Sequence, residues 1–164
     1  MSRGLPDQVD VWRMVSGRRC FSGQLPLASL PRLRDSLADV GGTVEFELEF
    51  GTDEFDQAYV GLRAQGELPL ICQRTLEVYR QPVAVSMRLG LIRREQDEAG
   101  LLPGYEAFLV PADGMIAPAD LIEDELILAL PLVPARPDSV LEQPEPDDTG
   151  GSHPFAALRS VRLQ

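Results

Sequence analysis

The chain has 164 residues, of which 44% are hydrophobic. This size suits one globular domain with an irregular tail, and it can bury a core without disulfides or metals. The formal net charge is −11, with 26 acidic against 15 basic residues, which argues against a general nucleic-acid coat protein, normally a basic class. Cys20 and Cys72 make no disulfide framework.

No signal peptide is expected at the start of the chain, and no segment approaches the roughly 18 consecutive apolar residues that a membrane helix needs. We therefore expect a cytoplasmic protein without membrane association.

The first part of the chain predicts a short strand and then a helix. Residues 18–27 favour the strand, and residues 27–40 favour the helix because apolar residues recur there at helical spacing. These apolar residues are Leu30, Leu33, Leu37 and Val40. Pro31 is tolerated in a first turn, and the pair Gly41-Gly42 ends the helix.

Alternating apolar and polar residues predict most of the sheet. Residues 44–50 place apolar side chains on one face and glutamates on the other, which is typical of a half-buried antiparallel strand. Residues 58–64 and 67–72 predict two further strands, with Gly66 marking a bend or bulge between them.

A second alternating run predicts the remaining strands. It starts at residue 75 and continues to about residue 91, and Pro82 within it favours a sheet edge or a bulge. Residues 93–104 predict a mobile loop, and residues 105–110 predict a final strand. The expected fold is α+β: a bent antiparallel sheet of five or six strands with two main helices packed on it.

Residues 117–130 predict the second main helix. Pro118 suits its first turn, and acidic residues near its start suit the helix dipole. Asp120, Glu123 and Asp124 share one face, which we expect to stay open for a basic partner. The apolar face should bury Leu121, Leu128 and Ala129 against the sheet; Glu125 falls inside this apolar arc and either reaches solvent at its rim or pairs with a partner such as a sheet arginine.

Three domain segments follow from these patterns. Residues 1–136 form a single α+β domain, and residues 137–151 form a linker with five acids, three prolines and no base, which we expect to be disordered. Residues 152–164 form an apolar and basic tail, whose Pro154, Phe155 and Leu158 are candidates for docking on a partner.

The basic residues are segregated. Between residues 59 and 94 there are six arginines against two acids. The candidates for binding the phosphates of RNA are Arg63, Arg74, Arg80 and Arg88. We expect at least three of them to cluster on one exposed face; the alternative is that they only solvate the outer side of the sheet.

The sequence contains no recognisable catalytic motif. The single histidine, His153, lies beside the linker that we expect to be disordered, no Ser/His/Asp or Cys/His arrangement can be assembled, and no glycine-rich phosphate loop is present. Cys20, Cys72 and His153 lie in no zinc-ligand spacing. We therefore expect no enzyme activity, cofactor or metal; a nuclease that uses carboxylate-bound metal is the least favoured alternative.

Three segments resemble the YceD family, the large ribosomal RNA subunit accumulation proteins. They are Asp120-Leu-Ile-Glu-Asp-Glu-Leu-Ile-Leu-Ala-Leu-Pro-Leu-Val-Pro134, His153-Pro-Phe-Ala-Ala-Leu158 and Leu70-Ile-Cys-Gln-Arg-Thr75. The family usually has Cys-x-x-Cys at the third segment, where this chain has Cys72-Gln-Arg-Thr75, so the resemblance implies no metal or redox role there.

The resemblance implies a bacterial ribosome biogenesis factor that supports accumulation or processing of large-subunit (23S) ribosomal RNA, without catalysis. Its expected partner is ribosomal RNA or a pre-ribosomal particle. The alternative is a protein-only adaptor whose acidic helix and tail recruit a basic ribosomal protein or a processing enzyme.

Overall fold

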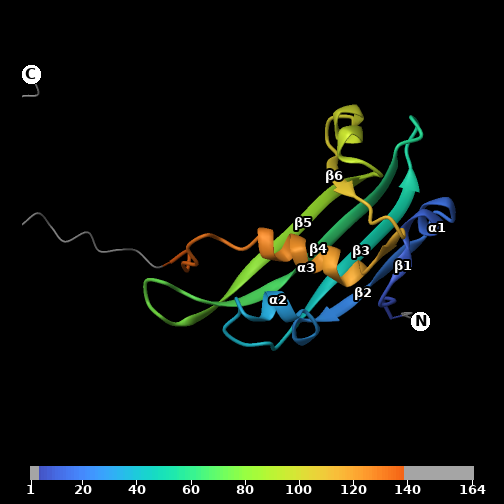
Figure 1. Cartoon of the computed structure of the whole chain (residues 1–164). Coiled ribbons are helices and arrows are strands. Elements are labelled where there is room, and N and C mark those ends of the chain that lie inside the picture. Colours follow the sequence, from blue (N-terminus) through green and yellow to red (C-terminus); the bar gives the residue numbers. More distant parts are fainter. Residues whose placement is uncertain (1–3, 139–164) are drawn as a thin grey trace, which may run out of the picture.

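A computed structural model describes residues 4–138 of the chain, and its main feature is a five-stranded sheet with the order β2-β3-β4-β5-β6. The first three neighbouring pairs are antiparallel, and β6 runs parallel to β5 (Figure 1). The strands of this sheet are β2 (Cys20–Pro26), β3 (Thr43–Thr52), β4 (Ala58–Ile71), β5 (Val78–Ile92) and β6 (Glu106–Leu109). The α+β class and the five strands are confirmed, whereas the all-antiparallel sheet is wrong, since the pairing is mixed.

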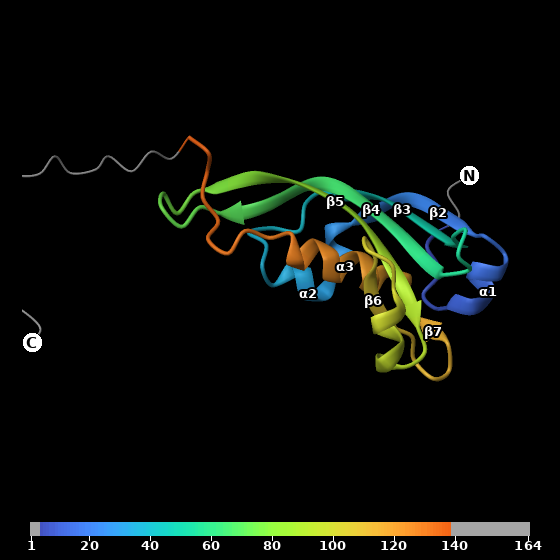
Figure 2. The same cartoon turned by 90° about the horizontal axis from the view of Figure 1, so that it is seen from above.

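The remaining elements are short, apart from one helix. They are β1 (Val9–Asp10), α1 (Val11–Ser16), the 3-10 helices η1 (Leu27–Ser29) and η2 (Glu95–Gly100), α2 (Pro31–Arg34), β7 (Met115–Ile116) and α3 (Pro118–Leu128). β1 pairs with β7 in a separate two-stranded sheet. Figure 2 shows the long strands β4 and β5 arching over α2 and α3, which lie on the concave side of the sheet.

The core lies between the inner face of the sheet and the helices. The inward side chains of β3 are the apolar residues of the alternating pattern, Val44, Phe46, Leu48 and Phe50, and all four are buried. They belong to one apolar cluster with residues of α2 and α3, among them Leu33, Ile122 and Leu126. The alternation in this strand therefore predicted the buried face correctly.

The long helix predicted over residues 27–40 is wrong. Pro31 does begin a helix, but α2 ends at Arg34, and the chain then turns toward the sheet. The backbone N–H of Ala38 donates to the carbonyl of Pro69 in β4 at 2.8 Å. Leu37 packs beside the β4–β5 hairpin, so a tertiary contact replaces the helical one.

The bend predicted at Gly66 is also wrong, because β4 runs unbroken from Ala58 to Ile71. Gly66 lies opposite Val44 and Val83 within the regular register. Pro82 causes no bulge either, since it pairs in register with Glu67. It does lie on an edge: β6 pairs only with residues 89–92 of β5, which leaves the other side of Pro82 without a strand.

The helix predicted over residues 117–130 is present as α3, but its buried face differs from the prediction. Leu121 is buried as expected, together with Ile122 and Leu126, whereas Leu128 is 75% exposed and Ala129 is exposed. The loop predicted over residues 93–104 contains η2. Most of the predicted linker and the whole tail lie outside the described residues.

Candidate nucleic-acid interface

The outer face of the sheet carries its polar side chains in rows that run across four strands. One row contains Ser22, Glu47, Arg63 and Ser86; the next contains Gln24, Glu45, Gln65 and Ala84. A third row contains Cys20, Glu49, Gly61 and Arg88. Residues directly opposite each other in antiparallel strands share a face, so each row is a line of neighbouring side chains.

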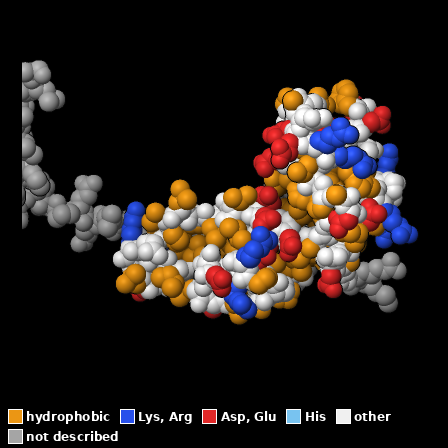
Figure 3. Space-filling view, viewed as in Figure 1, with side chains coloured by type: hydrophobic (Ala, Val, Ile, Leu, Met, Phe, Trp, Pro, Cys, Tyr) orange, Lys and Arg blue, Asp and Glu red, His pale blue; other side chains and the backbone are white. Residues whose placement is uncertain are grey.

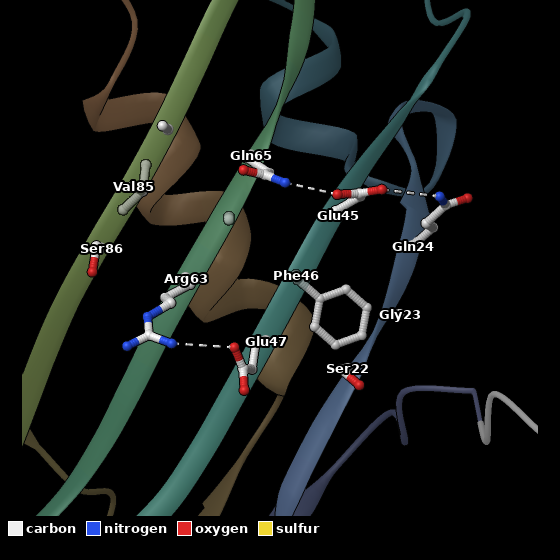
Figure 4. A pocket seen from close by; sticks show the side chains of 12 residues that line it. Ser22, Gly23, Gln24, Glu45, Phe46, Glu47, Arg63, Gln65, Val85 and Ser86 are labelled. Atoms are coloured by element: carbon white, nitrogen blue, oxygen red, sulfur yellow. Dashed lines mark hydrogen bonds and ion pairs between the residues drawn. The ribbon is translucent and has the colours of Figure 1, made fainter.

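Hydrogen bonds connect the side chains within these rows. Gln65 Nε2 donates to Glu45 at 2.8 Å, and Gln24 Nε2 donates to the other oxygen of the same carboxylate at 3.5 Å. Arg63 forms an ion pair with Glu47 at 3.4 Å, in which both side chains are exposed (Figure 4). An exposed pair of this kind contributes little to stability, so Arg63 is available to exchange partners.

Small side chains leave an open hollow on this face. Its volume is about 850 Å³, and it is lined by Gly23, Ala84 and Ser86 together with the polar residues of the rows (Figure 4). Two further hollows share lining residues with it and extend toward Arg80 at one end and toward Arg88 at the other. Together they form one shallow trough along the outer face.

Three of the four predicted arginines share this face, but they form a line and not a compact cluster. Arg63, Arg80 and Arg88 are all exposed and point outward. Arg80 and Arg88 are eight residues apart on β5, which corresponds to about 27 Å. Arg74 lies elsewhere, in the turn between β4 and β5. The predicted cluster is therefore only partly formed.

Each outward arginine has a defined position. Arg80 donates to the carbonyl of Gly41 at 3.3 Å, next to the start of β3. Arg88 lies over the ring of Tyr59, with its guanidinium carbon 5.1 Å from the ring centroid. The Tyr59 hydroxyl donates to Glu49 at 2.9 Å. Arg63 and Arg80 therefore have polar contacts, whereas Arg88 both lies over the Tyr59 ring and interacts with the side chain of Tyr105.

The prediction that the acidic face of α3 stays exposed is wrong for one of its three residues. Glu123 is 1% exposed, and its carboxylate accepts hydrogen bonds from α2. Asp124 is half-exposed and pairs with Arg32, and Asp120 is exposed. Glu125 is half-buried at the rim of the apolar arc; burial raises the pKa of its carboxyl, and the neighbouring Glu106 and Asp124 add to this. No arginine among residues 4–138 pairs with it.

The segment after α3 folds back on the β4–β5 hairpin. Gln73 N–H donates to the carbonyl of Pro134 at 2.8 Å, and Arg136 forms an ion pair with Glu77 at 3.0 Å. Leu130 and Ala135 pack against the buried cluster of Leu70, Cys72 and Tyr79. Two of the segments that carry the family resemblance therefore contact each other in space.

Cys72 is buried at the centre of this contact. The backbone N–H of Arg136 and the hydroxyl and backbone of Thr75 donate hydrogen bonds that lower the pKa of the Cys72 thiol from its ordinary 9.0 to about 6. Cys20, by contrast, is exposed, and its pKa is raised by partial burial and by Glu47 and Glu49. Nowhere in residues 4–138 are three metal-ligating side chains grouped to hold an ion.

Sequence comparison assigns the chain to a family. A model of the family described as "Large ribosomal RNA subunit accumulation protein YceD" matches residues 60–160. The chain belongs to this family. It is also similar to the large ribosomal RNA subunit accumulation protein YceD of Haemophilus influenzae, with 29% identity over 168 residues that cover 96% of each chain.

The match to the YceD family includes β4, β5 and α3, and therefore all four predicted arginines and the acidic helix. No solved structure matches the chain. Within the described residues, no helix is long and apolar enough to cross a membrane.

The sequence reasoning missed several basic residues near this face. Arg18 and Arg19 directly precede β2, at the end of the sheet where Arg88 also lies. They lie about forty residues before the arginine-rich segment of residues 59–94, so only the strand pairing brings them near its arginines. The sequence signal that could have identified them is the arginine pair itself, at the start of the strand predicted over residues 18–27.

Proposed function

We propose that this protein supports the accumulation of large-subunit ribosomal RNA by binding that RNA, alone or in a pre-ribosomal particle, in the cytoplasm and without catalysis. Membership of the YceD family supports the biological process. The observation that carries the binding mode is that Arg63, Arg80 and Arg88 point outward from one exposed, grooved sheet face.

The arrangement of these arginines suits an extended polyanion. Three exposed guanidinium groups spread along about 27 Å of strand can contact phosphates several nucleotides apart on one extended strand. The outward glutamates of β3, Glu45, Glu47 and Glu49, lie between them and β2 and equal the three arginines in number, so their charges offset each other. Binding should therefore be moderate in affinity and should weaken as salt rises.

The test is charge reversal with a matched charge-conserving control. Arg63→Glu, Arg80→Glu and Arg88→Glu in one chain should weaken binding to a large-subunit ribosomal RNA transcript at least about tenfold. The corresponding triple lysine variant keeps the charge and should lose much less. Unchanged binding in the glutamate variant would remove the outer face from the RNA interface and would favour the adaptor function.

One observation favours the adaptor as a second candidate. Leu128, Leu132 and Val133 are strongly exposed directly beyond the exposed acids of α3. An apolar patch next to Asp120 and Asp124 suits a partner that is basic and partly apolar, such as a ribosomal protein. In that case the partner should remain bound to the tagged protein after ribonuclease treatment.

A further inference from the structure

The end of the sheet where β2 begins and β5 ends collects arginines from distant parts of the sequence. Arg18 and Arg19 lie directly before Cys20, which shares a cross-strand row with Arg88. The four strands of this row span about 14 Å. The arginines at this end are Arg13 on α1, Arg18, Arg19, Arg88 on β5, and Arg93 and Arg94 just after β5. We call these six residues the arginine end, and Figure 3 shows basic side chains gathered over α1 and η2.

The arginine end is not neutralised by ion pairs. None of its six side chains forms a salt bridge with a carboxylate of residues 4–138. Elsewhere in this range Arg32, Arg63 and Arg136 do form such pairs. Arg34 and Arg80 also lack such a pair, so the distinguishing feature of the arginine end is that six arginines without carboxylate partners lie at one end of the sheet, which favours binding of an external anion.

Carboxylates are present nearby, but they bind other donors. Asp53 accepts hydrogen bonds from the backbone N–H groups of Phe55 and Gln57 and from the Tyr105 hydroxyl. Glu49 accepts from the Tyr59 hydroxyl. Asp10 and Asp97 likewise accept from the backbone N–H groups of Arg13 and Arg94, respectively. Asp10, Asp53 and Asp97 thus stabilise turns and helix starts, and none of these four acids forms a salt bridge with an arginine of the arginine end.

The guanidinium groups of two of the arginines lie over aromatic rings. The guanidinium carbon of Arg93 lies 3.9 Å from the ring centroid of Trp12, and that of Arg88 lies 5.1 Å from the centroid of Tyr59. Stacking fixes the plane of a guanidinium group and leaves its N–H edges free. A guanidinium group fixed in this way can bind a phosphate with two parallel hydrogen bonds at low entropic cost.

Arg88 connects the arginine end to the outer face of the sheet, because it lies over the ring of Tyr59. Burial raises the pKa of the Tyr59 hydroxyl, and its hydrogen bond to Glu49 acts in the same direction. The positive charges of Arg88 and Arg18 act in the opposite direction. Arg88 also lines one of the hollows that form the trough. The arginine end is therefore continuous with the trough described above.

We propose that the arginine end is the principal contact for the RNA phosphate backbone, and that the strand then follows the trough toward Arg80. This inference rests on the proposed function and adds the residues that anchor the RNA. Six guanidinium groups without carboxylate partners, two of them stacked, fit a run of phosphates better than they fit any single small anion.

The test compares single substitutions of exposed arginines that lack ion pairs. Arg18→Glu and Arg19→Glu change the arginine end, and Arg34→Glu makes the same charge change in α2, beyond the far end of β2. Binding of the full chain to a large-subunit ribosomal RNA transcript is measured across a salt series. The fluorescence of Trp12, the only tryptophan, and a thermal unfolding curve check that each variant is folded.

We expect Arg18→Glu and Arg19→Glu each to weaken binding by about fivefold or more and to reduce the salt slope by about 1, with Arg34→Glu staying within about twofold. Equal losses of RNA affinity in all three variants, or a loss only in Arg34→Glu, would show that the arginine end is not the principal contact. RNA binding itself would still stand. A wild-type chain that does not bind the transcript would overturn the proposed function instead. Binding to polyglutamate that matches binding to RNA would identify an acidic protein as the partner and overturn the inference.

Discussion

The carboxylate of Glu123 joins α3 to α2 through three hydrogen bonds. One oxygen accepts from the backbone N–H groups of Arg32 at 2.6 Å and of Leu33 at 3.0 Å, and the other accepts from Arg32 Nε at 3.1 Å. The first N–H groups of a helix have no partner within the helix, so Glu123 caps α2 from a distant part of the chain.

Replacing Glu123 with alanine should therefore destabilise the protein. Two buried N–H groups would lose their acceptor, and Arg32 would keep only Asp124 as a carboxylate partner. We expect the free energy of unfolding in urea to fall by about 2–4 kcal/mol, with a smaller loss for Glu123→Gln, which keeps one acceptor oxygen. Asp120→Asn is the exposed control. A loss below about 0.5 kcal/mol for Glu123→Ala would show that the cap contributes nothing.

The hydrogen bonds to Cys72 predict an acidic thiol. In a Cys20→Ser background, the thiolate absorbance should titrate near pH 6, and Thr75→Val should raise the pKa because it removes the hydroxyl donor. Since the pKa is lower in the folded state, the thiolate stabilises the fold fully above the unfolded pKa of about 9, and this contribution disappears as the pH falls toward 6. A thiol that titrates near pH 9 would contradict these hydrogen bonds.

At the scale of elements, the connection between β5 and β6 depends on the absence of a side chain at Gly90. A Cβ atom there would lie 2.6 Å from Leu101 Cδ2 and 3.3 Å from Tyr105 Cβ. Gly61 lies in the outward-facing row of β4, and a Cβ atom there would have only ordinary contacts of 3.7 Å or more.

Gly90→Ala should thus lower the free energy of unfolding by about 1 kcal/mol, because the end of the Leu101 side chain must move aside and Tyr105 Cβ must shift by a few tenths of an ångström. Gly61→Ala should change it by less than about 0.5 kcal/mol. Chemical denaturation of both variants measures the difference. Equal effects would mean that the close approach at Gly90 is relieved without cost.

The strands could be predicted from the sequence better than the helices could. Alternation identifies β3 and the inward face of β5 from Val83 onward because its period is a property of the strand itself, whereas Leu76 and Val78 in the first part of the predicted run are exposed. The helix predicted over residues 27–40 failed because Glu123 caps the start of α2 and contacts with β4 redirect the chain after Arg34. The buried position of Glu123 similarly depends on α2, which is 90 residues away in sequence.

At the scale of the whole molecule, the candidate interface could be predicted only in part. The local excess of arginine between residues 59 and 94 identified Arg63, Arg80 and Arg88. Their spacing along the strands, and the approach of Arg18 and Arg19, depend on cross-strand register, which composition does not contain. The exposed apolar side chains at and after the end of α3 were not predicted, because the helix was expected to continue to residue 130, whereas α3 ends at Leu128.

The C-terminal tail, which lies outside the described residues, gives a prediction at this scale. The described residues form their own buried core, so deleting residues 152–164 should leave the melting temperature nearly unchanged. Recruitment of a protein partner should be lost, because Pro154, Phe155 and Leu158 are the candidate docking residues. A large fall in melting temperature would show that the tail belongs to the core.

The central claim is that the protein binds large-subunit ribosomal RNA. It is tested most directly by purifying the tagged full-length protein from cells, with and without ribonuclease treatment, and measuring the RNA and proteins that accompany it. The account predicts that large-subunit ribosomal RNA is enriched over small-subunit RNA, and that ribosomal proteins are lost after ribonuclease. Absence of this RNA, or partners that all remain after ribonuclease, would contradict it.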